Sequence, residues 1–197
     1  ASKQEIIRRY YAELCRQKEN AAESQAVGKI EMLMQRADIS VHDRPVVRLA
    51  NEKAELTGAP AMAIELPGGE VLTGKTSALL GAGAAVILNA LKALAGIDDK
   101  VELISPSVIR PVQHLKIDYL GNQNPRLHVD EILIALAISA VTSKRAAAAL
   151  EQLDNLKGLE AHSTVILSSS DQKTFKKLGI NMTCEPKYQV KKLYHSK

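Results

Sequence analysis

Residues 69 to 76 are a full match to the phosphate-binding loop pattern G-x-x-x-x-G-K-[ST]. In a working loop of that kind a buried parallel strand ends at the first glycine, and the loop amides surround the phosphates as a helix begins. Here residues 61–66 have the pattern of a strand, residues 67–69 form a tight turn, and residues 70–73 alternate again. That pattern predicts a β-hairpin. We therefore expect a second strand in place of a nucleotide-binding loop, with Gly69 and Gly74 at its opposite ends.

Hydroxyl-rich segments follow three predicted strands, at residues 73–77, 105–110 and 168–171. In open parallel sheets ligands bind beyond the carboxyl ends of the strands, and the first amides of a helix attract an anion. The candidate anion ligands at these junctions are Lys75, Thr76, Ser77, Ser105, Ser107 and Arg110. Ordinary helix capping explains the same hydroxyl side chains, so both interpretations stay open.

His128, Asp130, His162 and Cys184 are secondary candidates. A metal site would need an arrangement such as H-E-x-x-H or paired C-x-x-C, and the sequence has neither. Asp130 suits the first turn of a helix without any metal. Cys184 with His162 as its base is a candidate nucleophile, although a lone cysteine is more commonly a small buried hydrophobe. We expect no metal and no cofactor.

The composition indicates a soluble globular protein, with 46% hydrophobic and 24% charged residues in 197. Aromatic residues make up only 3% and Trp is absent, so base-stacking platforms and a nucleic-acid partner are not expected. Cys15 and Cys184 lie far apart and belong to no C-x-x-C, which is typical of a reduced, cytoplasmic protein. No signal peptide is visible, and the apolar stretch 78–91 is too short to span a membrane.

The order of predicted elements gives an α/β fold, with a helical lead-in segment over 1–58 and an α/β sandwich domain over 59–197. The lead-in has helical periodicity over 3–36, and Pro45 opens a short helix that ends at Gly58. The expected helices after the hairpin lie near 77–95, after 105, over 128–153 with a break near Ser143, and between the last two strands. The expected strands are 61–66, 70–73, 101–105, 164–168 and 181–185. This predicts a three-layer α/β/α arrangement around a five-stranded mixed sheet that starts with a β-hairpin.

A faint internal repeat relates residues 101–117 to residues 164–180, with the same offset throughout. In both, a buried strand ends in Ser-x-Ser, a helix follows, and Leu-x-Ile closes the unit. Any two strand–loop–helix units look similar, so the repeat has an alternative explanation of equal weight.

Several phrases of the sequence together resemble a bacterial family. They lie at residues 57–60 and 73–77, at 124–131, at 161–163, at 183–186 and at 193–195. They resemble the family called domain of unknown function eighteen-forty-six, over nearly the whole chain. Members of that family are longer and have no established activity. The resemblance implies that this chain is the C-terminal portion of a larger protein.

The C-terminal part of that family is similar in architecture to the cytidine deaminase fold. Residues 75–78 stand where the first zinc motif of a deaminase would be, and residues 106–110 stand where Pro-Cys-x-x-Cys would be. Neither zinc motif is present, so zinc-dependent deamination is not expected. A metal-free purine-biosynthesis formyltransferase has the same fold and handles a phosphorylated substrate, an analogy at the level of the fold only.

Two hypotheses of function follow. In the first, the domain binds a small anionic or phosphorylated metabolite at the strand-to-helix junctions without metal, and whether it is a transferase, a hydrolase or no enzyme stays open. In the second, it is a non-catalytic structural or oligomerisation domain of a larger protein. In either case the apolar stripe of the lead-in predicts a homo-oligomer.

Overall fold

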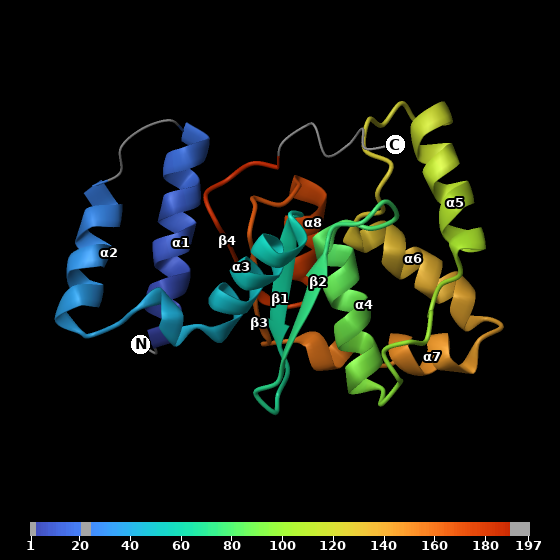
Figure 1. The fold of residues 1–197 in the computed structure, drawn as a ribbon, viewed down its shortest axis with the longest axis horizontal. Helices are drawn as coiled ribbons and strands as arrows, with labels where there is room; N and C mark the ends of the chain where they lie inside the picture. Colours follow the sequence, from blue (N-terminus) through green and yellow to red (C-terminus); the bar gives the residue numbers. More distant parts are fainter. Residues whose placement is uncertain (1–2, 21–24, 190–197) are drawn as a thin grey trace.

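The computed structural model describes residues 3–20 and 25–189, which form an α/β fold with a four-stranded mixed sheet (Figure 1). The strands are β1 (Ala61–Glu65), β2 (Val71–Lys75), β3 (Glu160–Ser163) and β4 (Asn181–Cys184). Their order in the sheet is β2-β1-β3-β4. β1 is antiparallel to β2 and to β3, and β3 is parallel to β4.

Helices precede the sheet, as the sequence predicted. They are α1 (Lys3–Asn20), α2 (Gln25–Arg36), the short 3-10 helix η1 (Val41–Asp43) and α3 (Pro45–Thr57). Gly58 ends α3 with a φ of 64°, a left-handed conformation that glycine adopts at little cost. The apolar stripe of α1 and α2 forms its own small core around Ile7, Tyr11 and Met34.

The remaining helices follow the hairpin. They are α4 (Ala82–Leu94), α5 (Pro106–His114), the π-helical turn η2 (Leu115–Tyr119), α6 (Val129–Ala140), α7 (Lys144–Leu150), η3 (Leu153–Leu156) and α8 (Ser169–Lys177). The predicted break near Ser143 is confirmed, since its hydroxyl accepts the amide of Ala146 at 3.2 Å and caps α7.

Alternate residues of β1 face two different layers. Ala63 packs with Val46 and Ala50 of α3 on one face. Met62 and Ile64 point to the other face, into the main core that they share with α4, α6, α7 and α8. The expected arrangement of helices on both faces of a sheet is therefore present.

The hairpin prediction is confirmed. The amide of Leu66 donates to the carbonyl of Glu70 at 2.8 Å, and Gly69 sits in the turn with a φ of 83°. Gly74 lies inside β2, where a Cβ would come within 2.4 Å of the backbone nitrogen of Val86. The second glycine of the phosphate-loop pattern thus allows α4 to approach the sheet closely.

The prediction of five strands is wrong for the described residues. Residues 101–105 form a loop, in which Leu103 and Ile104 are buried in the core without pairing to the sheet. Lys92 of α4 holds the chain just before this loop, because its ammonium group donates to the carbonyl of Asp99 at 2.6 Å. Neither 101–105 nor 164–168 is a strand in the structure, so the strand of the proposed internal repeat has no counterpart in either half.

The third strand also lies earlier than predicted, at Glu160–Ser163 instead of 164–168. The chain leaves the sheet at Thr164, whose hydroxyl accepts the amide of Ala61 at 3.0 Å. Beyond that residue the amide of Ile166 donates to the carbonyl of Lys187, outside the named strands. A half-buried apolar run over residues 165–167 therefore continues past the end of the strand, which explains the misplaced boundary.

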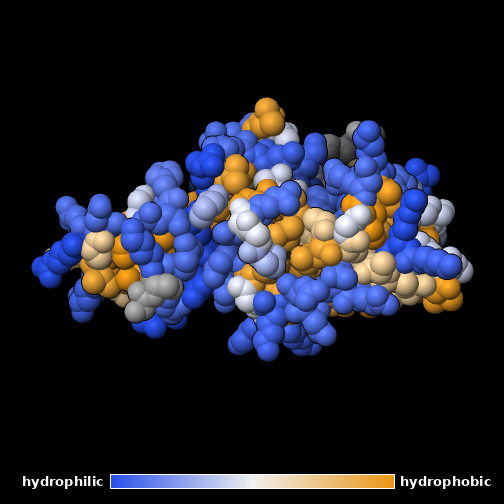
Figure 2. All heavy atoms as spheres, turned by 90° about the horizontal axis from the view of Figure 1, so that it is seen from below, coloured by the Kyte–Doolittle hydropathy of each residue, from blue (hydrophilic) through white to orange (hydrophobic). Residues whose placement is uncertain are grey.

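The surface keeps some apolar side chains. Figure 2 shows a group of them toward the end of the molecule that holds α6 and α7, and the exposed residues of α6 and its end include Ile134, Ile138 and Val141. None of the helices in the described part of the chain has the length and apolar character needed to cross a membrane. The homo-oligomeric state stays a prediction, as does the domain division at residue 58.

Candidate functional site

Three helices begin around one cavity of about 330 Å³. They are α4, α6 and α8, whose N-cap residues are Gly81, His128 and Ser168. All three N-caps line the cavity. Because the first amides of a helix carry partial positive charge, the three helix starts together favour a negatively charged guest.

A short parallel bridge places two of these helix starts beside each other. Leu80 pairs with Leu127, the amide of Leu127 donates to the carbonyl of Leu79 at 3.0 Å, and the amide of Gly81 donates back to Leu127 at 3.2 Å. The loop before α4 and the loop before α6 are thereby held in register. These backbone hydrogen bonds therefore fix the relative position of the two helix starts.

Hydrogen bonds from Arg126 and Lys116 stabilise the same two loops. The Nε atom of Arg126 donates to the carbonyl of Ser77 at 2.6 Å. The buried ammonium group of Lys116 donates to the carbonyl of Arg126 and to Glu131, each at 2.7 Å. Glu131 in turn accepts the amide of His128 at 2.7 Å. The cavity wall is therefore a connected polar network.

The start of α4 has no side chain to cap it. Gly81 carries none, and no described side chain caps this end of the helix. Ala82 and Gly83 are buried and line the cavity. A Cβ on Gly83 would come within 3.1 Å of Phe175, so the absence of a side chain there keeps the helix start close to α8. Buried first-turn amides without a capping group are what an anion would satisfy.

His128, Asp171 and Ser168 form a hydrogen-bonded group in the cavity wall. Nδ1 of His128 lies 2.9 Å from Oδ2 of Asp171, and the hydroxyl of Ser168 donates to the same oxygen at 3.1 Å. The other carboxylate oxygen accepts the amide of Val129 at 2.8 Å. Asp171 thus joins the starts of α6 and α8.

The pKa values of this pair move apart. The hydrogen bond to Asp171 raises the pKa of His128, although burial opposes the shift. Burial acts to raise the pKa of Asp171, but the hydrogen bonds from His128 and Val129 outweigh it and hold that pKa below its usual value. Both shifts favour the imidazolium–carboxylate form of the pair over its neutral form.

The geometry of the histidine leaves one ring nitrogen for a ligand. Asp171 engages Nδ1, so Nε2 is the nitrogen that remains to donate to an anion or to transfer a proton. Ser168 is a helix cap whose hydroxyl accepts the amide of Asp171 at 3.2 Å and donates to its carboxylate. That arrangement suits anion binding and acid–base chemistry better than nucleophilic attack by the serine.

The structure separates the first group of predicted anion ligands. Thr76 lines the cavity, whereas Lys75 and Ser77 are exposed and are not among its lining residues. The helix expected to begin at residue 77 begins at Ala82. The amide of Thr76 donates to the carbonyl of Pro60, so it forms no anion nest.

The second group lies elsewhere. Ser105 caps α5, its hydroxyl lying 2.8 Å from that of Ser107 and accepting the amide of Ser107 at 3.2 Å. Arg110 is exposed on the same helix. None of the three lines the cavity between α4, α6 and α8. Their role in anion binding stays a prediction.

Of the secondary candidates, His128 alone belongs to the cavity. Asp130 is exposed and accepts the hydroxyl of Ser170 at 2.8 Å. His162 is fully buried, with Nδ1 at 2.8 Å from the hydroxyl of Thr183 and Nε2 at 3.2 Å from Glu185. Burial lowers the pKa of His162, so its neutral form is favoured and Nε2–H donates to the carboxylate.

Cys184 ends β4 near the other cysteine, whereas His128 precedes α6 and lies outside the sheet. The thiol of Cys15 donates to the carbonyl of Cys184 at 3.2 Å. Burial raises the pKa of the Cys184 thiol to about 11 and that of Cys15 to about 12. Thiols with such pKa values are poor nucleophiles at neutral pH. Within the described ranges, no group of three or more His, Cys, Asp or Glu side chains is arranged to hold a metal ion.

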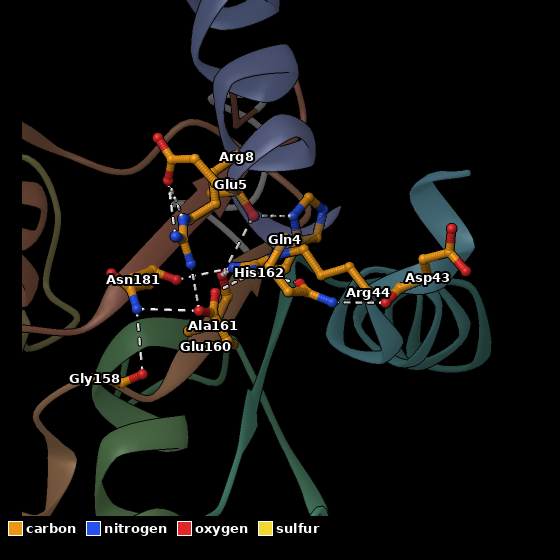
Figure 3. A network of polar contacts seen from close by, with 11 residues as sticks. Gln4, Glu5, Arg8, Asp43, Arg44, Gly158, Glu160, Ala161, His162 and Asn181 are labelled. Carbon is orange, nitrogen blue, oxygen red and sulfur yellow. Dashed lines mark hydrogen bonds and ion pairs between the residues drawn. The ribbon is translucent and has the colours of Figure 1, made fainter. Parts of the chain in front are cut away.

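A second polar network joins the N-terminal helices to the sheet (Figure 3). Arg44 is fully buried and pairs with Glu160, and it also donates to the carbonyls of Ala161 and Asn181 at 2.8 Å each. Arg8 of α1 pairs with the other oxygen of Glu160. Every oxygen of this carboxylate is engaged by a guanidinium group, so the network holds the fold together and offers no open site.

Sequence reasoning identified part of the cavity. The 168–171 junction, Thr76 and His128 were among the segments and residues of interest, and the structure brings them together. The sequence patterns did not indicate that the start of α4 and Arg126 would belong to the cavity. The Gly-Ala-Gly at residues 81–83, directly before an apolar helix, was the available signal for a helix start without a side-chain cap.

Comparison with known proteins agrees with the resemblance noted in the sequence. The chain is 55% identical over 194 residues to a UPF0371 protein of Streptococcus thermophilus, and 54% identical over 194 residues to UPF0371 proteins of Streptococcus pyogenes serotype M3 and Streptococcus uberis. Each alignment covers 98% of this chain and 39% of the relative. The pattern described as "Domain of unknown function DUF1846, C-terminal" matches residues 42–194. The chain therefore belongs to the DUF1846 family, whose function is not established.

Proposed function

We propose that the cavity between the starts of α4, α6 and α8 binds a small anionic metabolite, with a phosphoryl group at the uncapped start of α4. The observation that carries the proposal is the buried, uncapped first turn of α4, which lines the same cavity as His128, whose pKa is raised. Amides at a helix start and a charged imidazole are both groups that bind phosphate oxygens.

The size of the cavity fits a small metabolite. Its volume of about 330 Å³ lies at the low end of the range of small-molecule sites. Asn124 and Thr76 add polar side chains to the wall, and Leu127 and Ile166 add apolar ones. A phosphorylated compound with a modest organic part matches this mixture better than a bare inorganic ion.

The pairing of His128 with Asp171 also makes acid–base catalysis part of the proposal. A transferase or hydrolase acting on the bound compound would use Nε2 of His128 as the proton donor or acceptor. A cytoplasmic location, a homo-oligomeric state and the likeness to the cytidine deaminase fold belong to the same proposal. The metal-free analogy to the formyltransferase concerns a phosphorylated substrate and is consistent with it.

The test replaces Gly81 in the longer protein that carries this chain. Gly81 has extended backbone angles and room for a Cβ, since the nearest atom would be 3.7 Å away. Gly81→Asp puts a carboxylate at the N-cap, where it satisfies the α4 amides from within the protein. Binding of inorganic phosphate, nucleotides and sugar phosphates is then measured by thermal shift and calorimetry.

We expect Gly81→Asp to weaken phosphate binding at least about tenfold while leaving the protein as stable as before or more so. Gly81→Ala is the matched control, because it adds the same Cβ without charge and should keep binding. Unchanged binding in Gly81→Asp would contradict the proposal. Lys75→Ala tests the original sequence-based site independently, and a loss of binding there alone would move the site to the end of β2.

The non-catalytic alternative predicts a different result. If the polar network around the cavity only caps helices, no phosphorylated compound should shift the melting temperature of the unmodified protein, and Gly81→Asp should simply stabilise it.

A further inference from the structure

β4 is the last strand of the sheet among the described residues, and its outer edge pairs with no other described strand. The amides of Asn181 and Glu185 donate toward the β3 side, at 2.8 and 2.9 Å. Backbone groups alternate in direction along a strand, so the N–H and C=O groups of Met182 and Cys184 point away from β3. The outer edge of β4 therefore presents main-chain donors and acceptors.

Two adjoining cavities follow this edge. One has a volume of about 280 Å³ and the other about 410 Å³, and they share Arg8, Gln172 and Met182. Arg8 belongs to α1, Gln172 to α8 and Met182 to β4. The two cavities thus form one groove along β4, with α1 on one side and α8 on the other.

We propose that this groove receives an extended segment of the longer protein to which this chain corresponds, which pairs with β4 as a fifth strand. Main-chain hydrogen bonds to the open edge would supply the affinity, as in other cases of strand addition. The segment would bond to Met182 and, where the thiol of Cys15 leaves room, to Cys184.

The length of the relatives argues for an occupant from the same polypeptide. This chain covers only 39% of each relative, so more than half of each relative lies outside it. A segment joined to the same chain has a high effective concentration at the groove. Edge-to-edge pairing with a second copy is disfavoured by the flanking helices. The β4 edge of that copy would be flanked by its own α1 and α8, which would collide with those of the first.

The walls of the groove predict the pattern of the segment. On the α8 side it would meet the half-buried side chain of Met182, which favours an apolar side chain. On the α1 side it would meet Arg8 and Arg16, whose guanidinium groups already pair with glutamates of this chain, and the carboxylate of Glu19, so uncharged polar side chains are favoured. Alternation of apolar with uncharged polar residues is therefore expected in the segment.

Hydrogen exchange of single amides in the full-length protein tests the pairing. Thr183 donates its amide toward β3 and serves as the internal reference. We expect the amide of Met182 to be protected to within about tenfold of Thr183, because both would be in a ladder. Exchange of Met182 at the rate of an open edge contradicts the proposal. Protection that disappears on dilution also contradicts it, since a second copy would then be the occupant.

A proline substitution identifies the occupant. Met182→Pro removes an N–H that points away from β3, a position where an edge strand tolerates proline. We expect at least about tenfold faster exchange in one segment outside the 197 residues. Val71→Pro is the control, because the amide of Val71 also points away from its neighbour, on the opposite edge. If the two variants give the same exchange pattern outside the 197 residues, the groove is not the docking site.

Discussion

The carboxylate of Asp171 holds Nδ1 of His128 at 2.9 Å, across 43 residues of sequence. This pair connects the starts of α8 and α6 and leaves the other nitrogen of the imidazole for the cavity. We predict that Asp171→Asn lowers the pKa of His128, because the hydrogen bond to the carboxylate is the main cause of its elevation. An NMR titration of the ring protons of His128 measures the effect.

Asp130→Asn is the matched control for that titration. Asp130 is an exposed carboxylate in the first turn of α6, two residues after His128 in the sequence. It accepts a hydrogen bond from the hydroxyl of Ser170. Its loss should leave the pKa of His128 much closer to the unmodified value. Equal effects of the two substitutions would mean that any negative charge near the start of α6 raises the pKa of His128, and that the contact with Asp171 has no special role.

Anion binding should depend on pH. The folded-state pKa of His128 is raised, so its positive charge is present at low pH and is lost as the pH rises through that elevated value. Sulfate is a suitable probe because its charge is constant across the neutral range. We expect sulfate affinity to fall as the pH rises, and His128→Asn to flatten the profile. A pH-independent affinity in the unmodified protein would contradict the role of His128.

Two glycines should respond to alanine in opposite directions. At Gly74 a Cβ would overlap the backbone of Val86 at 2.4 Å, so Gly74→Ala should destabilise the protein by at least about 2 kcal/mol. At Gly28 in α2 a Cβ would have no neighbouring atom within 4 Å, so Gly28→Ala should stabilise by roughly 0.5–1 kcal/mol. Chemical denaturation measures both. A tolerated Gly74→Ala would mean that α4 does not lie as close to β2.

Removal of one partner from the buried ion pair should be costly. Arg44→Met leaves Glu160 with less compensation, and Glu160→Gln leaves the fully buried Arg44 uncompensated. Each should destabilise the fold by about 3–5 kcal/mol, as measured by urea unfolding. The double variant should cost less than the two singles together, since it leaves neither charge alone. Additive costs would show that the two residues act independently.

Acid should destabilise the protein through His162. Its folded-state pKa is lowered by burial, so between that value and the unfolded value the unfolded state binds more protons. Stability is then complete above the unfolded pKa of about 6.5 and decreases as the pH falls below it. His162→Gln should reduce this slope in unfolding experiments from neutral to mildly acidic pH. An unchanged slope would assign acid sensitivity to other groups.

The sequence was sufficient for elements whose signals are local. Pro67-Gly68-Gly69 marked the hairpin turn, Pro45 and Gly58 marked the ends of α3, and Ser143 marked the break before α7. Residues 101–105 have the composition of a strand, but the sheet offers them no partner and they are buried as a loop. Strand pairing is a tertiary property that composition does not determine.

The candidate site was predictable only in pieces. The 168–171 junction and His128 were identified from hydroxyl, acidic and imidazole side chains near expected helix starts. Their meeting with Gly81 depends on the bridge between Leu80 and Leu127, which joins segments far apart in the sequence. Such contacts are set by how the helices pack, so no local pattern could indicate them.

The buried Arg44–Glu160–Arg8 network also sets limits on where the protein can be divided. The family match begins at residue 42, but Arg8 and Tyr11 of α1 contact Glu160 and Glu185 of the C-terminal half. A recombinant protein cut at residue 42 would lose both contacts, and one cut at residue 58 would also lose Arg44. The shortest segment suitable for expression therefore starts at or before α1, ahead of the boundary that family membership suggests.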